Sequence, residues 1–597
     1  MLVIVGMCLL VHPYAGLIHD SRLYTLQALN HLHPELYGND VFLKYGSQDD
    51  YTVFSRLYAG VIALFDVEPA AKAITFTSVV ALLLSFAKLA RTLMPARLAW
   101  LAIGLFVIVP GFYGEGLVFA VIEEFVTPRM LAESLVLLSV ITWLKEKRFI
   151  ATTLLLAALL VHPIMAFPGM VLLFVLGWGL PHWRRLLALT LIGLVIASFA
   201  LGGWIPTHPL QFDDAWRRVA HWAHHLLLSK WTISDWARVA SIFVTLGFAV
   251  HLAPSPARRL ALATLITCCL LLLLAWIGGD LLDIALVVQG QAWRCLWIAT
   301  TLAVLLLPLV VARCWEGSAL QRSSALLLIG SWVLQHQSLG LLFTALALIA
   351  ILLSERSVPD RVARLAEPSA WMLLGAILVC IISVEWTDRI AKVADGTYAA
   401  SWFEALRLIC DDRIAPAAVL ICAWFLSGRI RSLRQAGILT ACAAVPTALV
   451  LGPAAHALER EYYPQEARDA FASWREVIPP GTDVLWAIRF IPESDPVGAW
   501  LLLERPSYYS SVQYNSGLFS REAAMEFIKR YNSIPRALPT EQPIPVVYRG
   551  DAIQTPVCAD LPVKHVVAEV RIPDAALIPA PAQVGPPFDR LQLQICP

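Results

Sequence analysis

Long apolar stretches, separated by short basic clusters, recur along the chain as far as Leu451. A helix needs roughly 17–25 mostly apolar residues to cross a bilayer, and many of these stretches are that long. Of the 597 residues, 58% are hydrophobic and only 15% are charged, which excludes an ordinary soluble domain. The pattern therefore predicts a polytopic α-helical membrane protein with about 13–15 spans.

The basic clusters predict how the chain is oriented, because Lys and Arg concentrate in cytoplasmic loops. They include Lys145–Arg148, Arg258–Arg259 and Arg429–Arg434. The acidic loops between such clusters then face the other side of the membrane. The loops that we consider candidates for catalysis are 19–52, 112–129 and 278–294. Residues 1–454 are expected to form the membrane domain.

Two apolar stretches, 149–180 and 323–354, each have a polar break where a tight turn fits. The breaks are at His162 and at Gln335–Gln337. The segment Val53–Phe65 is expected to lie along the membrane interface, because polar side chains interrupt it. The N-terminal segment has no basic start and no small-residue cleavage site, so we expect it to be retained.

The composition changes after Leu451. Residues 455–597 are rich in proline and charge and contain no spanning segment, which predicts a small soluble α/β domain. Its helix-like and strand-like runs are Pro464–Val477, Ser520–Tyr531, Thr482–Ile488 and Lys564–Ile572. The last span leads outward from the cluster Arg429–Arg434, so the domain should be extracytoplasmic, on the outer face of a bacterial inner (plasma) membrane.

The only cysteines of this domain are Cys558 and Cys596. An oxidising compartment lets them pair, and we predict a disulfide between them. The other cysteines lie in apolar stretches without the spacing of a zinc site. In the same domain, Tyr508–Gly517 is aromatic and polar enough to face a glycan, although a hairpin with core tyrosines fits equally well.

The first polar loop begins with Asp20, directly after the first apolar segment. This position anchors the carboxylate at the membrane surface, where ionisable groups are seldom idle. A partly desolvated carboxylate held there can act as a general base. The alternative is that Asp20 only caps a helix over Ser21–Asn30.

The second loop contains the acidic pair Glu123 and Glu124, followed by Pro128 and Arg129. Proline is tolerated in the first turn of a helix, so Arg129 should lie at the membrane face. This arrangement makes a compact site for a cation, or for a sugar together with a phosphate. A simple ion pair between Glu123 and Arg129 explains the pattern equally well.

The third loop ends with Gln291, Trp293 and Arg294 at the head of an apolar span. An arginine beside a tryptophan suits a lipid phosphate and its isoprenoid tail, although Trp293 alone fits an interfacial anchor. His162 is a further candidate for contact with a substrate. The histidines of segment His221–His225 are interpreted as part of an interfacial amphipathic helix, because no carboxylate stands near them in the sequence.

This order of parts resembles the GT-C superfamily of membrane glycosyltransferases, in particular its protein O-mannosyltransferase and aminoarabinose transferase families. The resemblance rests on a first-loop Asp before a helix with Arg22 and Tyr24, an acidic pair before Pro-Arg, many spans and a C-terminal extracytoplasmic domain. In that superfamily a first-loop acidic residue is catalytic. The resemblance therefore implies this role for Asp20, with Asp40 as second choice, and implies that the acidic pair helps to bind acceptor or metal.

The resemblance also implies a polyprenyl-phosphate sugar as donor, a lipid, glycan or protein as acceptor, and inversion at the anomeric carbon. Asp20 would accept the proton of the acceptor hydroxyl. Arg129 or Arg294, with or without a divalent cation, would stabilise the departing phosphate. The predicted substrate-binding residues are Arg22, Tyr24, Glu123, Glu124, Arg129, His162, Gln291 and Arg294.

Two other classes of function stay open at this point. A transporter or flippase of lipid-linked sugars would explain the spans, but such proteins usually have repeated halves, and no repeat is evident in the sequence. A non-catalytic component of envelope assembly would use the soluble domain to bind a partner. No nucleic-acid partner is expected.

Overall fold

The computed structural model describes residues 2–109, 111–203, 210–356, 364–376, 465–486, 498–533, 558–568, 574–580 and 591–597, with 359, 361 and 571–572 besides. The predicted last spans, the basic cluster Arg429–Arg434 and the domain boundary after residue 454 lie outside the described residues.

The N-terminal part is almost entirely helical. Its first elements are α1 (Leu2–Val11), α2 (Ser21–Leu32), α3 (Pro34–Tyr37), α4 (Val41–Lys44), α5 (Phe54–Phe65), α6 (Val67–Leu93), α7 (Ala96–Ile108), α8 (Arg129–Leu144), α9 (Arg148–Val161) and α10 (Pro163–Phe174). They are followed by α11 (Trp183–Leu201), α12 (Asp214–Ala220), α13 (Ile233–Leu252), α14 (Ala257–Leu274), α15 (Ala285–Gly290), α16 (Leu296–Trp315), α17 (Ala319–Val333) and α18 (Leu339–Leu353). The two-residue strands β1 (Phe112–Tyr113) and β2 (Phe119–Ala120) form a small antiparallel hairpin between α7 and α8.

Several helical stretches are long and apolar enough to cross a membrane. They are Val67–Leu93, Trp183–Leu201, Ile233–Leu252, Ala257–Leu281 and Ala285–Trp315. Shorter apolar helices accompany them, for example α9, whose 14 residues reach about 21 Å at the usual helical rise. The prediction of a helical protein with apolar, membrane-length helices is therefore confirmed, while the number of spans and their orientation stay predictions.

Both polar breaks predicted inside apolar stretches are confirmed. Helix α9 ends at Val161 and α10 begins at Pro163, with His162 between them. Likewise α17 ends at Val333 and α18 begins at Leu339. At the first break, His162 and Pro163 interrupt the helical hydrogen bonds of the apolar stretch. At the second break, a short turn between α17 and α18 does so.

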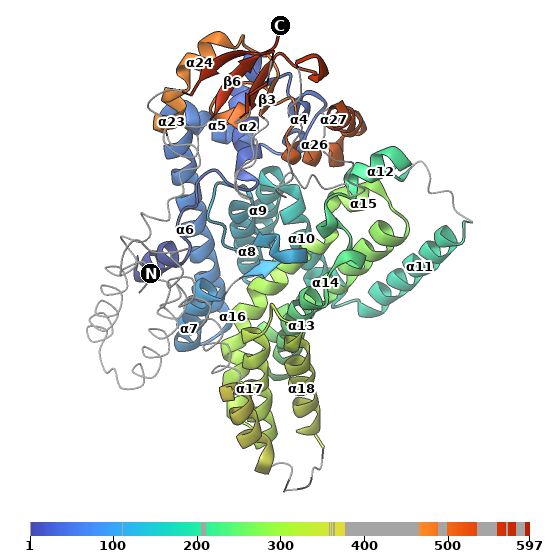
Figure 1. Cartoon of the computed structure of the whole chain (residues 1–597). Helices are drawn as coiled ribbons and strands as arrows, with labels where there is room; N and C mark the ends of the chain where they lie inside the picture. The colour runs from blue at the N-terminus through green and yellow to red at the C-terminus, as the bar shows by residue number, and fades with distance from the viewer. Residues whose placement is uncertain are drawn as a thin grey trace.

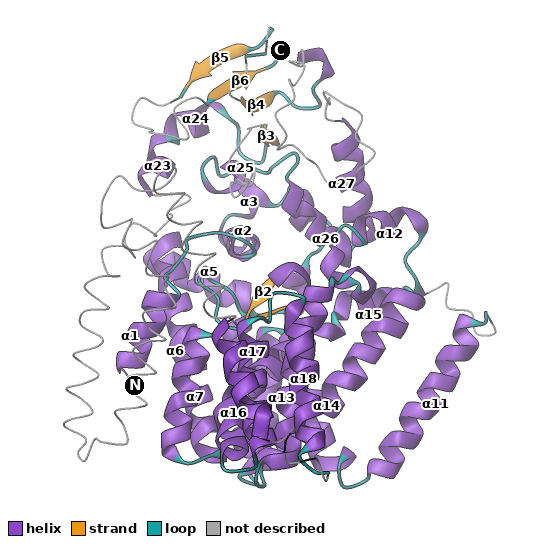
Figure 2. Cartoon of the chain, turned by 60° about the horizontal axis from the view of Figure 1, so that its bottom comes forward, coloured by secondary structure: helices purple, strands orange, loops and turns teal. Residues whose placement is uncertain are grey.

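Helix α16 lies at the centre of the helical bundle. Every side chain from Leu296 to Val310 is buried, as expected for a helix that is hydrophobic on all sides. Helices α7, α13, α14 and α17 pack around it. By contrast, no side chain of α11 is buried, and this helix stands apart from the bundle in two views (Figures 1 and 2).

The C-terminal part caps one end of the bundle, above α2 to α5 (Figure 1). It contains α23 (Gln465–Ala470), α24 (Ala472–Val477), α25 (Gly498–Leu501), α26 (Tyr514–Phe519) and α27 (Arg521–Ser533). Its strands are β3 (Val484–Trp486), β4 (His565–Ala568), β5 (Ala576–Pro579) and β6 (Gln592–Ile595). They form a sheet in the order β3-β4-β6-β5, with β3 parallel to β4 and the other pairs antiparallel.

The predicted helix-like and strand-like runs of this part are confirmed, while its being a separate extracytoplasmic domain stays a prediction. The runs contain α23, α24, β3 and β4, and α27 begins inside the run Ser520–Tyr531 and ends at Ser533. Cys558 and Cys596 form the predicted disulfide, with a Cα–Cα distance of 5.3 Å. The proposed hairpin at Tyr508–Gly517 is wrong, because a short 3₁₀ turn at Ser511–Gln513 leads directly into α26.

Asp40 joins the first loop to the C-terminal part of the chain, which we call the C-terminal cap. Its carboxylate is fully buried and accepts hydrogen bonds from the backbone N–H groups of Phe42 (2.9 Å) and Ser507 (2.8 Å). It also accepts from the Trp500 indole (2.6 Å) and the Gln513 amide (2.9 Å). Burial raises the pKa of Asp40 to about 6, although these hydrogen bonds favour the ionised form.

We expect Asp40→Asn to loosen the cap. An amide oxygen accepts fewer hydrogen bonds than a carboxylate, and its NH₂ group would face donors, so the cost should be about 2–4 kcal/mol. The thermal midpoint of the detergent-solubilised protein should fall, and the chain around Trp500 should become protease-sensitive. Glu35→Gln is the control, because Glu35 lies in the same loop with an exposed side chain. Equal protease resistance in both variants would contradict this role.

Candidate functional site

The hairpin of β1 and β2 shapes the centre of the site. Gly114 has φ +86°, and a Cβ atom there would lie 2.8 Å from the Trp293 ring, so the turn requires glycine. Helix α13 holds this turn: Arg238 donates to the Gly114 carbonyl (2.9 Å), and Asp235 accepts from the Gly116 N–H (3.2 Å). The hairpin thereby fixes the position of Phe119 on β2.

Two buried arginines lie against the ring of Phe119. The guanidinium carbon of Arg129 is 4.7 Å from the ring centroid, and that of Arg294 is 4.0 Å from it. The exposed fractions of the two residues are 1% and 6%. A cation over an aromatic face is favourable, particularly where water is excluded. The second and third predicted loops therefore meet at one aromatic ring.

Arg129 is neutralised by two carboxylates. Its Nη1 lies 2.6 Å from Asp20, and its Nη2 and Nε lie 2.6 Å and 2.9 Å from the two oxygens of Glu123. The ion pair between Glu123 and Arg129, one of the two readings of the second loop, is confirmed. Asp20 stands at the N-cap position of α2 but makes no side-chain capping hydrogen bond, so the capping alternative is wrong.

Arg294 differs from Arg129 because no carboxylate neutralises it. Its Nε donates to the Gln291 side-chain oxygen (2.7 Å), and its Nη1 contacts the sulfur of Met165 (3.7 Å). Within the part of the chain that the structure describes, no acidic group lies within ion-pair distance of Arg294. A buried guanidinium without a counter-ion is costly, so this geometry suits an anionic ligand.

The charges of the site control its titration. Burial alone would raise the pKa of Asp20, but the positive charges of His19 and Arg129 outweigh it and hold the pKa well below its ordinary value. Burial, together with the charge of Arg294, lowers the pKa of His225 to about 4. At neutral pH Asp20 is therefore ionised and the His225 imidazole is neutral.

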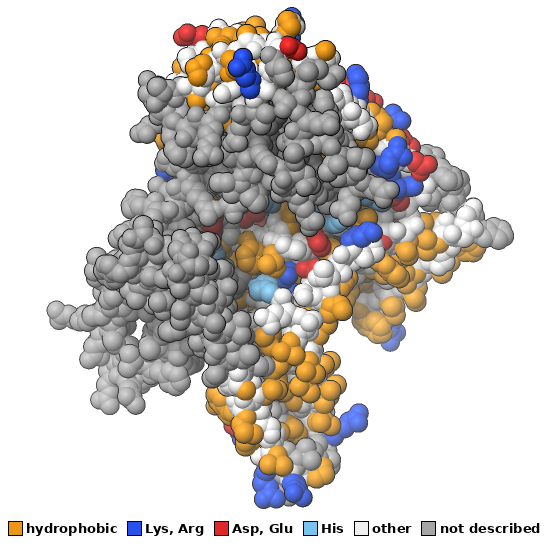
Figure 3. Space-filling view, viewed as in Figure 1, with side chains coloured by type: hydrophobic (Ala, Val, Ile, Leu, Met, Phe, Trp, Pro, Cys, Tyr) orange, Lys and Arg blue, Asp and Glu red, His pale blue; other side chains and the backbone are white. Residues whose placement is uncertain are grey.

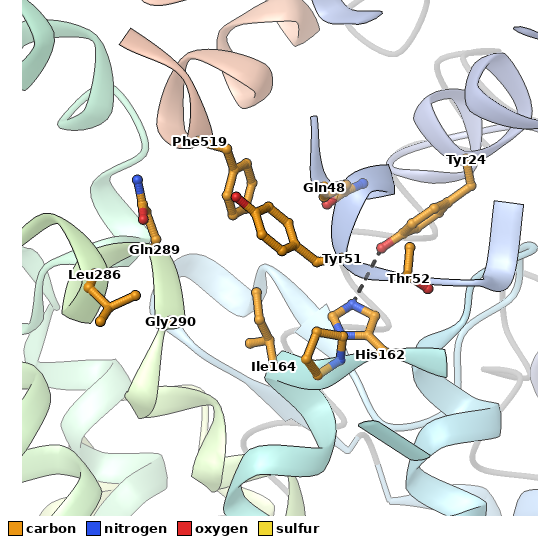
Figure 4. A pocket seen from close by; sticks show the side chains of 11 residues that line it. Tyr24, Gln48, Tyr51, Thr52, His162, Ile164, Leu286, Gln289, Gly290 and Phe519 are labelled. Carbon is orange, nitrogen blue, oxygen red and sulfur yellow. Dashed lines mark hydrogen bonds between the residues drawn. The ribbon is translucent and has the colours of Figure 1, made fainter. Parts of the chain in front are cut away.

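A pocket of about 200 Å³ opens beside this cluster (Figure 4). Its lining residues are Tyr24, Gln48, Tyr51, Thr52, His162, Pro163, Ile164, Leu286, Gln289, Gly290 and Phe519. Tyr24 points toward His162, with 3.5 Å between the hydroxyl and Nε2. The pocket joins the first loop, the break after α9, the end of α15 and the C-terminal cap. In Figure 3, a few charged and histidine side chains are visible near the centre of the face shown, above the largely hydrophobic surface of the bundle.

Most of the predicted site residues lie together, either around Phe119 or in the adjacent pocket. Asp20, Glu123, Arg129, Gln291 and Arg294 meet around Phe119, and Tyr24 and His162 line the adjacent pocket.

Three predicted residues point elsewhere. Arg22 donates to the His19 carbonyl (3.1 Å), and Glu124 pairs with His12 (3.3 Å). Asp40 is saturated by donors from its own loop and the C-terminal cap, which favours a structural role over the catalytic one.

The interpretation of the histidine segment is wrong in two respects. Helix α12 ends at Ala220, and the histidines follow it, with His224 and His225 in a 3₁₀ turn instead of an amphipathic helix. His221 does have a carboxylate partner, because its Nε2 lies 3.1 Å from Asp283, which is distant in sequence. The short helix α12 before it packs against the C-terminal cap: the Trp216 indole donates to the Gly517 carbonyl (2.6 Å). This segment therefore contacts both the turn before α15 and the C-terminal part of the chain.

Two important residues were missed from the sequence. Phe119 is an ordinary aromatic residue in an apolar context, and nothing in the sequence marks its position between two arginines. Glu133 lies one turn after Arg129 on α8 and is fully buried, and neither of its oxygens has a hydrogen-bond partner among the described residues. An acidic residue inside an apolar run was the signal for it.

No cluster of metal-ligating side chains occurs in the described ranges, and the divalent cation stays a prediction. Comparisons with protein-family models, with curated proteins and with solved structures give no match to the chain. The geometry of the site is therefore the basis for proposing a function.

Arg294→Gln should weaken binding of a soluble isoprenoid phosphate such as farnesyl phosphate by roughly 10- to 100-fold, the cost of a lost charge-assisted hydrogen bond. Arg294→Lys should recover only part of the affinity, because an ammonium group cannot replace a planar fork. Isothermal titration in detergent measures both. Arg322→Gln is the control, since Arg322 pairs with Glu367 elsewhere in the bundle. Unchanged affinity in Arg294→Gln would remove the anion site.

Proposed function

We propose that this protein is a membrane glycosyltransferase that transfers a sugar from a polyprenyl phosphate to an extracytoplasmic acceptor. One observation carries the proposal: Arg294 is buried without a counter-ion, beside a carboxylate and a pocket. A phosphate supplies the ion-pair partner that Arg294 lacks among the described residues. The carboxylate of Asp20, 24% exposed, is available to an acceptor that enters from solvent.

The residues suit a single inverting displacement. The acceptor hydroxyl oxygen attacks the anomeric carbon as the bond from that carbon to the phosphate oxygen breaks. Asp20 accepts the hydroxyl proton, and the phosphate departs with the electron pair. Arg294 and Arg129 stabilise the charge that develops on it, and because both are already buried and oriented, little reorganisation is needed.

The ion pair with Arg129 has a consequence for Asp20. A carboxylate held by an arginine is a weak base, whereas a general base works best with a pKa near the working pH. A donor phosphate at Arg294 competes for the neighbouring guanidinium of Arg129 and so weakens its hold on Asp20. In this proposal the donor binds first and increases the basicity of Asp20.

One observation favours the transporter alternative. Glu133 is an unpaired, buried carboxyl group on an apolar helix, and such groups serve as proton relays in transporters. The charged cluster nevertheless adjoins the pocket, next to the part of the bundle that the C-terminal residues cover. Reconstituted protein distinguishes the two: transfer of labelled sugar to an acceptor supports the enzyme, and translocation of the intact donor supports the transporter.

Asp20→Asn should lower turnover by roughly 10²–10⁴ with an unchanged fold, because it keeps the size of the side chain but removes proton acceptance. Release of polyprenyl phosphate from a labelled donor measures the rate. Asp214→Asn is the matched control, since Asp214 is 89% exposed on α12. Normal turnover by a well-folded Asp20→Asn variant would exclude Asp20 as the base.

The pH profile should report the ion pair. In the free enzyme the positive charge of Arg129 lowers the pKa of Asp20, so the acid limb of kcat/KM should lie below the usual Asp range. Removing that charge raises the pKa and should move the limb to higher pH. The double variant Glu123→Gln/Arg129→Gln avoids leaving Glu123 buried and unpaired. A limb that does not move would show that another group controls it.

A further inference from the structure

A second pocket adjoins the first and has different chemistry. Its volume is about 300 Å³, at the lower end of the range for small-molecule sites. The residues around it are Tyr45, Gly46, Ser47, Asp50, Tyr51, Trp216, Phe519, Ser520, Arg521 and Glu522. It shares Tyr51 and Phe519 with the first pocket, and these rings lie 6.3 Å apart, centroid to centroid. The two rings therefore form a common wall (Figure 4).

The lining of this second pocket combines aromatic faces with hydrogen-bonding groups. The carboxylate of Asp50 is exposed and makes no hydrogen bond with the described part of the chain. Glu522 accepts from the Ser520 hydroxyl (3.2 Å). The first pocket, by comparison, receives apolar side chains such as Leu286, which is 76% exposed.

The aromatic part of the second pocket is held in place. The Trp216 indole donates to the Gly517 carbonyl (2.6 Å), and its ring packs edge-on against Phe212 with 4.7 Å between centroids. Arg521 forms an ion pair with Asp213 at the start of α12. These contacts bring the first loop, α12 and the start of α27 together around one space.

We propose that this second pocket binds a carbohydrate, the acceptor that receives the transferred sugar. The C–H face of a sugar ring packs on aromatic rings, and its hydroxyl groups donate to carboxylates such as Asp50 and Glu522. The acceptor role rests on the proposed function, whereas the binding site does not. The wall of Tyr51 and Phe519 then separates an acceptor pocket from a donor pocket with apolar lining.

Saturation-transfer NMR on the full-length protein in detergent tests this site. The probes are the methyl glycosides of mannose, glucose, galactose and N-acetylglucosamine. We expect saturable binding of at least one, weakened about tenfold in Asp50→Asn, as for the loss of one charge-assisted hydrogen bond. Trp216→Phe should weaken it as well. Asp214→Asn, on α12 but outside the pocket, should leave it unchanged.

The outcomes separate this site from the donor site. Asp50→Asn should keep its affinity for farnesyl phosphate, and Arg294→Gln should keep its affinity for the glycoside. Absence of binding by all four glycosides, or binding that neither variant weakens, overturns the proposal. Binding of a threonine-containing heptapeptide in place of the glycosides, with the same sensitivity to Asp50→Asn, also overturns it and identifies a peptide site. Glycoside binding combined with normal turnover in Asp20→Asn would retain the site while refuting the proposed catalytic base.

Discussion

The site depends on one buried guanidinium. Arg129 connects the first two loops, because Asp20 comes from the first loop, whereas Glu123 and Arg129 itself, at the start of α8, come from the second. Removing charged side chains from water is costly, and only close, well-oriented ion pairs compensate for that cost. Loss of the guanidinium would leave two uncompensated carboxylates in an apolar environment, so the two loops are ordered together.

A second buried carboxylate, that of Asp40, connects the first loop to the C-terminal cap. Asp40 accepts hydrogen bonds from Trp500 within α25 and from Ser507 and Gln513, which precede α26. Helix α26 ends at Phe519, which lines both pockets. The cap is therefore part of the walls of the site. A polar network of this kind specifies one arrangement, because each buried donor that loses its acceptor incurs the full cost of desolvation.

The sequence was informative where charge and hydrophobicity conflict. Asp20, Glu123, Arg129 and Arg294 are expensive to bury near a membrane, and that expense alone identified them as candidates. The disulfide was predictable for a different reason: Cys558 and Cys596 are the only cysteines after residue 454, so each had only the other as a partner there. Phe119 was not predictable, because its role comes from long-range packing that leaves no trace in local composition.

The same limit explains the different roles of Asp20 and Asp40. Both are first-loop acids, and both were candidates for the base. Burial disfavours the ionised form of both carboxylates. Asp20, however, has an arginine beside it and partial access to solvent. Asp40 has only neutral hydrogen-bond donors around its carboxylate and no access to solvent. A proton can reach only the first of them from an entering ligand. The environment set by distant segments, rather than the residue type, therefore decides which carboxylate is available for chemistry.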